Sequence, residues 1–364
     1  MMITRRAMTG GAAITAAVAA ITFAQPHAAS AQGADFSGRT VEVMVNFAAG
    51  GGVDQTARLI AGYIADHLPG NPSLIVTNRA GASGMAAVEH LMSSVAPDGL
   101  TIGYFAGPLL TWAIGVNPVP PGMEDLPVVV GRSVNHVVLA STSSGLNVDT
   151  FPGHTGRVFL AVNAPDNAMS IRMRLFADAV GVPGLEVISG YDTQPRMHAA
   201  VRAGEADMAP ANESAFGIAR ESLLGDGVLM AFGQLGEFTE NGIVAQAGLD
   251  DIPVLDEVWR RVAPDTLGSP AHRAWEAYTA AHSVHHYFVL PMNTPQPIID
   301  AWEAAILAAH EDPRYIEQMR SLGMPLPNPV RSAEMRQRLE TVRPIFADPE
   351  VTAVIEAAIA RNLR

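Results

Sequence analysis

The sequence of 364 residues contains no cysteine, and all 23 of its basic residues are arginine, because lysine does not occur. Without cysteine the chain has no disulfide, no thiol nucleophile and no cysteine-ligated metal. Without lysine it can form no Schiff base with a substrate and no Walker-type nucleotide site, since both need a lysine amine. These two absences exclude several large classes of enzyme.

Basic charge is also scarce, since 36 aspartates and glutamates outnumber the 23 arginines and give a formal net charge of −13. Nucleic acid and anionic membrane surfaces repel such a chain, so we expect neither as a partner. A small anion is not excluded, because local backbone dipoles decide whether it binds. Beyond the first residues no segment is long and apolar enough to span a bilayer, for which about 20 apolar residues are needed.

The first 31 residues have the pattern of a signal peptide. Arg5 and Arg6 precede a weakly apolar stretch over residues 8–24, and an Ala-Ser-Ala sequence ends at Ala31. We expect cleavage between Ala31 and Gln32, a mature chain with a charge of about −15, and a periplasmic location. Residues 4–8 resemble a twin-arginine signal, so both that route and general secretion stay open. A membrane anchor is the alternative interpretation of this segment.

The first unit of the mature chain is a strand, a glycine loop and a helix. Residues 40–47 place Val41, Val43, Val45 and Phe47 on one face, which predicts a strand. Three glycines follow over residues 50–52, and a helical pattern begins after them. We expect Asp54 to be the N-cap of this helix, and Pro69-Gly70 to end it.

A second unit repeats the first and indicates a parallel sheet. Residues 73–77 are a short apolar strand, residues 78–84 a glycine loop and residues 85–94 a helix. A third strand follows over residues 100–105. Strands that alternate with helices form parallel sheets with helices on their faces. Ligands of such sheets bind beyond the carboxyl ends of the strands, where both glycine loops lie.

The remainder predicts a second α/β lobe and a return to the first. Residues 137–140 read as a crossing strand, and residues 287–290 as the strand that leads back. Between them we expect strands at 157–162, 185–189 and 228–233 and helices at 168–180 and 195–203. We therefore assign residues 32–136 plus 288–364 to lobe 1 and residues 137–287 to lobe 2, with a ligand cleft and a hinge between them.

The first glycine loop is the feature that most favours ligand binding. Consecutive glycines let backbone N–H groups reach a ligand, and the helix that follows adds a partial positive charge, so a carboxylate can bind without arginine. A tight turn without function is the alternative. Gln55 stands where a dinucleotide fingerprint needs its third glycine. In the second loop Ser83 fits a helix cap or ligand contact better than a nucleophile, because the G-x-S-x-G spacing is missing.

His282, His285 and His286 could place two imidazoles on one helix face, although buried or interface histidines explain them better than a metal site. Glu205 and Asp207 read as a solvated polar turn. No pair of carboxylates is spaced for acid–base catalysis. We therefore expect no metal, no cofactor and no enzymatic activity.

The first lobe contains three motifs, Phe47-x-Ala-Gly-Gly-x-x-Asp54-x-x-Ala-Arg58, Asn78-Arg-x-Gly-Ala-x-Gly84 and Ala96-Pro-Asp-Gly99. These motifs resemble those of the tripartite tricarboxylate transporter receptors, also called Bug-type extracytoplasmic solute receptors. The similarity covers nearly the whole mature chain, is strong in the first lobe and at residues 295–323, and is weak in the second lobe. There the family's His-x-Pro-Tyr-Lys segment keeps only Tyr191, and residues 251–286 are longer than usual.

The resemblance implies a type II periplasmic-binding-protein fold, with two α/β lobes and a cleft that holds a small organic carboxylate. By position, the residues it assigns to the ligand are Phe47, Ala49, Gly50, Gly51, Asp54, Ala82, Ser83, Gly84, Asn163, Asn167 and Tyr191. It also implies integral-membrane transporter subunits as partners, and we expect the receptor to be monomeric. Two other functions stay open: a ligand-dependent partner of a membrane sensor kinase, and a serine hydrolase that uses Ser83.

Overall fold

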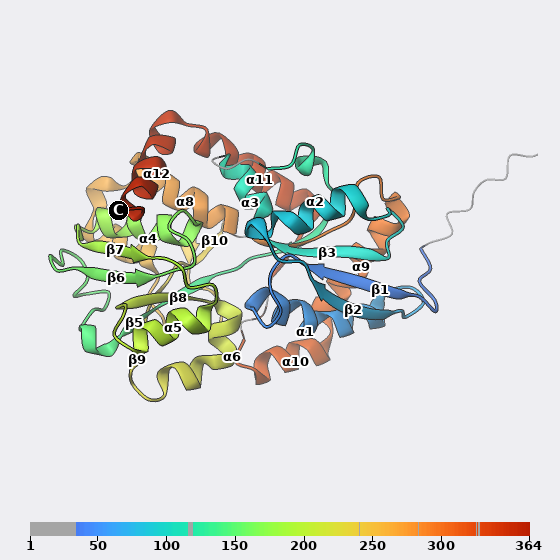
Figure 1. Ribbon diagram of the computed structural model, residues 1–364, viewed down its shortest axis with the longest axis horizontal. Coiled ribbons are helices and arrows are strands. Elements are labelled where there is room, and N and C mark those ends of the chain that lie inside the picture. Colours follow the sequence, from blue (N-terminus) through green and yellow to red (C-terminus); the bar gives the residue numbers. More distant parts are fainter. Residues whose placement is uncertain (1–33, 116–118, 240, 283, 325, 327) are drawn as a thin grey trace, which may run out of the picture. The chain divides into compact units, whose positions relative to one another are not determined.

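The computed structural model describes residues 34–364 except 116–118, 240, 283, 325 and 327. The predicted signal peptide and its cleavage site lie outside these residues. The strands form two larger sheets (Figure 1). The first has the order β13 (Pro329–Arg331), β4 (Val128–Arg132), β12 (His286–Val289), β3 (Thr101–Ala106), β1 (Thr40–Val45) and β2 (Ser73–Asn78). The second has the order β7 (Leu185–Ile188), β6 (Val158–Ala161), β8 (Met208–Asn212), β5 (His136–Ser141) and β9 (Leu229–Gln234).

Helices lie on the faces of both sheets, and a small hairpin joins β10 (Glu237–Thr239) to β11 (Gly242–Val244). The helices are α1 (Gly52–His67), α2 (Met85–Ser94), α3 (Pro108–Ile114), α4 (Ala168–Ala179), α5 (Gln194–Arg202), α6 (Glu213–Leu224), α7 (Leu255–Val262), α8 (Pro270–His282), α9 (Gln296–Glu311), α10 (Pro313–Ser321), α11 (Ser332–Phe346) and α12 (Pro349–Asn362). In the part of the chain that the structure describes, no helix has the length and hydropathy of a membrane span.

The repeated strand, glycine loop and helix occur as the sequence predicts. β1 is parallel to both β2 and β3, and its alternating Val41, Val43 and Val45 are fully buried. The start of α1 differs from the prediction: Gly51 is its N-cap, and Asp54 lies in the first turn. Asp54 does not cap the helix because its carboxylate is turned back toward the preceding loop.

Strand β8, which lies inside the second sheet between β6 and β5, was not predicted from the sequence. Pro210 argues against a central strand, because proline cannot donate a backbone hydrogen bond. In the structure β8 pairs with β5 over its whole length, but with β6 only through Leu160 and Met208. The proline therefore costs no hydrogen bond to β6.

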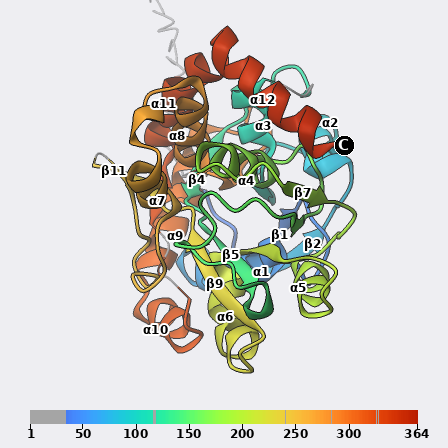
Figure 2. The same cartoon turned by 90° about the vertical axis from the view of Figure 1, so that its left-hand side faces the viewer.

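The chain passes between the sheets twice. It passes directly from Arg132 at the end of β4 to His136 at the start of β5, and it returns from β9 to β12 through β10, β11, α7 and α8. The C-terminal α12 packs against α4 and α8 (Figure 2), where Arg361 forms an ion pair with Asp178. The sequence assigns α12 to lobe 1. In the structure, however, α12 contacts α4, which follows β6 of the second sheet. The residue boundaries of the lobes stay a proposal.

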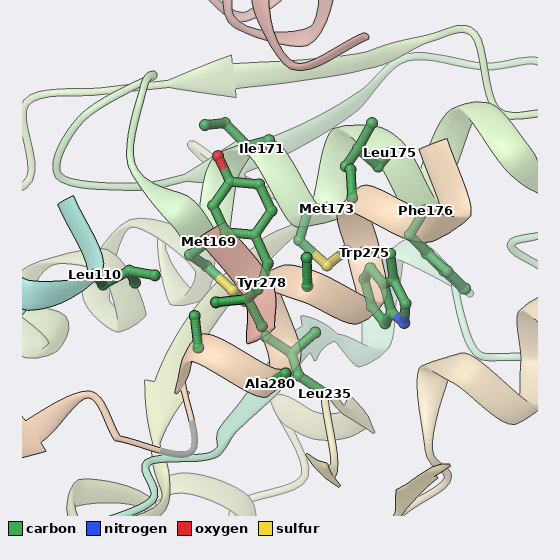
Figure 3. Close-up of a cluster of buried hydrophobic side chains, with 14 of the residues drawn as sticks. Leu110, Met169, Ile171, Met173, Leu175, Phe176, Leu235, Trp275, Tyr278 and Ala280 are labelled. Atoms are coloured by element: carbon green, nitrogen blue, oxygen red, sulfur yellow. The ribbon is translucent and has the colours of Figure 1, made fainter. Parts of the chain in front are cut away.

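The largest buried cluster holds α4 and α8 together. Figure 3 shows side chains of α4 and α8 meeting in this cluster, with Phe176 and Trp275 close to each other. Their ring centroids are 6.0 Å apart. Large aromatic side chains contribute much of the hydrophobic stabilisation of such a core. This packing holds α4 in place, and with it the loop that connects β6 to the amino end of α4.

Candidate functional site

The first glycine loop connects β1 to α1 and leaves the helix amino terminus without a side-chain cap. Phe47, Ala49 and Gly50 precede the N-cap Gly51, and Ala49 and Gly50 are exposed. Gly50 has φ of 79°, a left-handed conformation that favours glycine. Gly51 has an ordinary φ of −75°. The uncapped N–H groups of the first helical turn carry the partial positive charge that attracts an anion.

Asp54 organises this loop. Its carboxylate is only 2% exposed and accepts hydrogen bonds from Gly50 N at 2.8 Å, Arg58 Nε at 3.0 Å and Asn78 Nδ2 at 2.9 Å. Burial alone raises the pKa of Asp54, but these hydrogen bonds outweigh it and hold the pKa below its ordinary value. The ionised carboxylate thus supports the loop from behind through its contacts with Gly50 and Asn78.

The second glycine loop follows β2 and has an unusual backbone. Gly81, Ala82 and Gly84 have φ of 139°, 47° and 92°. Residues 82–84, with Ser83 in the middle, form a single 3-10 turn, and Gly84 then begins α2 without a side-chain cap. A left-handed alanine costs about 1–2 kcal/mol and is concentrated at functional sites. The strained backbone makes this loop a candidate for ligand contact.

Asn46 fixes the two loops relative to β3. It is fully buried, and its amide exchanges two hydrogen bonds of 3.0 Å with the backbone of Ala106 at the end of β3. A Cβ on Gly84 would lie 2.3 Å from Asn46 Nδ2, so only glycine allows the second loop to approach this closely. The carboxyl ends of β1, β2 and β3 are therefore joined into one preformed surface.

Asn212, at the end of β8, brings the second sheet to this surface. A Cβ on Gly52 would lie 2.3 Å from Asn212 Nδ2, so the amide rests directly on the first turn of α1. Asn212 Oδ1 meanwhile caps α6 by accepting from Ala215 N at 2.7 Å. The two sheets thus meet at the first glycine loop.

The second-lobe residues implied by the resemblance have local partners. Asn167 caps α4 by accepting from Ser170 N at 2.7 Å, and it also donates to Asn163. Tyr191 donates its hydroxyl to Glu205 at 3.2 Å, and burial together with this carboxylate raises the pKa of Tyr191. Among the described residues no hydrogen bond joins these three to the glycine loops. Asn163 is exposed, and the other two are partly exposed.

The histidines do not share a helix face. His282 ends α8, His286 begins β12, and His285 lies in the turn between them. The rings of His282 and His285 are stacked with centroids 4.8 Å apart, and His286 Nδ1 is 3.1 Å from the hydroxyl of Tyr104. Among the described residues no group of three or more potential ligands is arranged to hold a metal.

Asn46, Asn78 and Asn212 shape the site but were not identified as functional from the sequence. Asn78 is part of the second motif, and its position at the end of a strand was the available signal. Asn46 directly follows β1 and Asn212 ends β8, but their contacts with Ala106 and Gly52 depend on tertiary structure.

No protein-family model matches the chain. Within the curated proteins, a UPF0065 protein from Cupriavidus necator is 34% identical over 146 residues. This match covers 40% of the chain and 41% of that relative, so the chain spans about two-fifths of the relative's length.

Solved structures match over most of the chain. The periplasmic binding protein BugD has a TM-score of 0.59 at 19% identity and covers 88% of the chain and 97% of its own. A TctC solute-binding protein from Polaromonas scores 0.56 at 17% identity, covering 85% and 98%. MatC from Rhodopseudomonas palustris, solved with bound malate, scores 0.57 at 20% identity, covering 89% and 100%. The resemblance predicted from the sequence motifs is confirmed, and the chain has the two-lobed α/β fold of the periplasmic binding proteins.

Proposed function

We propose that the protein is a periplasmic solute-binding protein that captures a small organic carboxylate for a tripartite tricarboxylate-type transporter. The observation that carries this proposal is the surface formed by the glycine loops after β1 and β2, with the uncapped amino terminus of α1, on whose first residue Gly52 the Asn212 side chain of the second sheet rests. Such termini attract anions through backbone N–H groups and the helix dipole. The malate bound to MatC is an anion of this class.

The binding energy of a carboxylate here comes from several hydrogen bonds. Each charge-assisted hydrogen bond contributes about 1.5–3 kcal/mol, so a few give micromolar affinity, about −8 kcal/mol, after the cost of ordering. Gly50, Gly51 and Gly84 allow the ligand to approach the backbone, while Asp54 and Asn46 keep the loops in place. Phe47, Ala49, Ala82 and Ser83 complete the ligand-facing loops in this proposal, and Asn163, Asn167 and Tyr191 would read the other end of the solute.

In the part of the chain that the structure describes, no histidine–aspartate pair lies beside the second glycine loop, as the hydrolase alternative requires. His67 and Asp312 lie 3.2 Å apart, but His67 ends α1, a helix of 16 residues and about 24 Å, whose other end carries the first glycine loop. His272 and Asp256 pair inside the core, beside Trp259 and Trp275. Neither pair is placed to activate a nucleophile in residues 82–84. We therefore propose binding without turnover.

The location and partners follow from the same proposal. We expect a mature chain that begins near Gln32, is monomeric and docks onto integral-membrane subunits after the lobes close on the solute. A sensor kinase partner would use the same ligand site. N-terminal sequencing of exported protein that still carries residues 1–31 would contradict the periplasmic assignment, and replacing Arg5 and Arg6 with lysine separates the two export routes.

The experiment is native purification of the exported protein followed by mass spectrometry of the released small molecules. We expect an organic acid, and we expect that acid to raise the melting temperature by mass action while its amide does not. The melting temperature with malate and with malate diamide gives a first comparison. Equal stabilisation by an acid and its amide would contradict the anion site.

A further inference from the structure

An arginine that is buried between helices α4 and α8 has no anionic partner. Arg172 of α4 is only 1% exposed. Its Nη2 donates to Thr279 Oγ1 at 2.9 Å, and its guanidinium lies 5.3 Å from the ring centroid of Trp275. Its Nε has no hydrogen-bond partner, and no carboxylate among the described residues forms an ion pair with it. Buried charges are normally paired, because desolvation of an isolated ion is costly.

The other two buried arginines have the kinds of partner that Arg172 lacks. Arg174, two residues further along α4 and 3% exposed, donates to Asn362 Oδ1 at 3.0 Å and to the carbonyl of Leu185 at 2.6 Å. Arg132 forms an ion pair with Glu213. Arg172 alone of these three has neither a carboxylate nor a carbonyl among its partners. Burial accordingly lowers the pKa of Arg172 to about 9.

Further unpaired polar atoms belong to the neighbours of this arginine. The Tyr278 hydroxyl, His136 Nδ1 and His285 Nδ1 are buried without hydrogen-bond partners. Arg172 interacts electrostatically with all three side chains. Buried polar atoms without partners are rare, and several together call for a ligand or ordered water. These three atoms can therefore form hydrogen bonds with a ligand.

Arg172 and the histidines around it carry a single positive charge, which suits the binding of one anion. Burial, followed by the charge of Arg172, lowers the pKa of His285 to about 4 and keeps His282 neutral. Burial and then His285 lower the pKa of His136 to about 3. Near neutral pH the three imidazoles are therefore uncharged and Arg172 supplies the positive charge. Arg132, which acts on the neighbouring His286, is itself paired with Glu213.

Contacts on both sides connect this neighbourhood to the glycine loops. Gly107 N donates to the carbonyl of His285 at 3.2 Å, and Gly107 follows Ala106, which Asn46 binds next to Gly84. On the other side His136 is the strand partner of Asn212, whose amide rests on Gly52. His136 and His285 are partly exposed, with His136 at the start of β5 and His285 between α8 and β12.

We propose that Arg172, with Tyr278, His136 and His285 around it, binds a second carboxylate of the solute, opposite the carboxylate held by the glycine loops. The solute is then a molecule with two acidic groups at a spacing set by the distance between these sites. This inference rests on the proposed function and assigns its specificity to one side chain. Arg172 is buried without an anion because the ligand supplies the anion when the lobes close.

The test is calorimetric titration of the exported mature protein with the straight-chain dicarboxylates from malonate to suberate, with malate, and with the monoamide of each. The expected result is that the best dicarboxylate binds at least about tenfold more tightly than its monoamide, the effect of one charge-assisted pair. In Arg172→Met this preference should fall below about threefold, because the second carboxylate has lost its cation.

Arg174→Met is the matched control, because it removes a buried arginine from the same helix whose hydrogen bonds are satisfied within the protein. It should lower the urea midpoint of the ligand-free protein and leave the preference for dicarboxylates unchanged. Arg172→Met should leave the ligand-free midpoint unchanged or raise it, because it removes an unpaired buried cation.

Three results would overturn the inference. One is an unchanged dicarboxylate preference in Arg172→Met, and another is a ligand-free midpoint that falls as far as in Arg174→Met. The third is wild-type protein that binds monoamides or simple monocarboxylates as tightly as dicarboxylates, which would leave the proposed receptor function intact. Wild-type protein that binds no carboxylate at all would contradict both the inference and the proposed function.

Discussion

Arg132 and Glu213 form a buried ion pair between the two sheets, with 2.6 Å between Arg132 Nη2 and Glu213 Oε1. Arg132 ends β4 of the first sheet, and Glu213 begins α6 directly after β8 of the second. Arg132 Nε and Nη1 and Glu213 Oε2 have no partners, so the pair is incompletely satisfied. Burial raises the pKa of Glu213. The pair therefore joins the two sheets at a cost in desolvation.

We predict that Arg132→Met lowers the free energy of unfolding by about 3–5 kcal/mol, because it leaves Glu213 buried without a counter-charge. Adding Glu213→Met should restore most of that loss, since no isolated charge remains. Urea unfolding of the two single variants and the double variant measures this coupling. A double variant as unstable as the sum of the single variants would show that the two side chains act independently.

The buried histidines predict a loss of stability on mild acidification. Burial lowers the pKa of His136 to about 3 and of His285 to about 4, whereas an unfolded chain titrates near 6.5. Their stabilising contribution is therefore complete above about pH 6.5 and is lost as the pH falls toward 4, because only the unfolded state takes up protons. Melting temperatures between pH 7.5 and 4.5 measure it. His285→Gln should flatten the slope, and an identical slope in that variant would assign the effect elsewhere.

Gly52 offers a test of contact between the lobes. Gly52→Ala should weaken ligand binding, because its Cβ would lie 2.3 Å from Asn212 Nδ2 only while the sheets are together. The melting temperature of the ligand-free protein should change little. Gly62→Ala in the middle of α1 is the control, since a Cβ there meets nothing within 4 Å and alanine stabilises a helix by about 0.5–1 kcal/mol. Equal affinities of both variants would contradict the closed arrangement at Asn212.

Asp54 is predicted to act through the loop that it supports. Asp54→Asn replaces an acceptor of three hydrogen bonds with an amide and should lower stability by about 1–3 kcal/mol. We expect carboxylate affinity to fall at least about tenfold as the loop loses its conformation. Asp66→Asn is the control on the same helix, because its pair with Arg314 is exposed and contributes little. Similar affinity losses in both variants would contradict the role of Asp54.

The sequence predicted what depends on local pattern. The helix at residues 85–94 has the bounds of α2, and the repeated strand and glycine loop placed both loops at the carboxyl ends of parallel strands. The sequence did not predict the features that depend on tertiary contacts. Pro210 concealed β8, whose second partner strand pairs only through Met208, and the spacing of His282, His285 and His286 suggested a helix where a turn and a strand occur. The unpaired state of Arg172 cannot be read from sequence, because its surroundings come from α8 and β5.

The most direct test of the proposed carboxylate site compares two variants, Gly51→Val and Arg79→Gln. The quantity measured is the affinity of each variant for the acid recovered from native protein. Gly51 has an ordinary φ, and a Cβ there meets only the Ala48 carbonyl oxygen at 3.4 Å, so the fold should survive. Titration calorimetry with a thermal melt should show binding lost in Gly51→Val and nearly unchanged in Arg79→Gln, because backbone N–H groups hold the carboxylate. Wild-type affinity in Gly51→Val with a large loss in Arg79→Gln would show that an arginine holds it and that the glycine loop is only a turn.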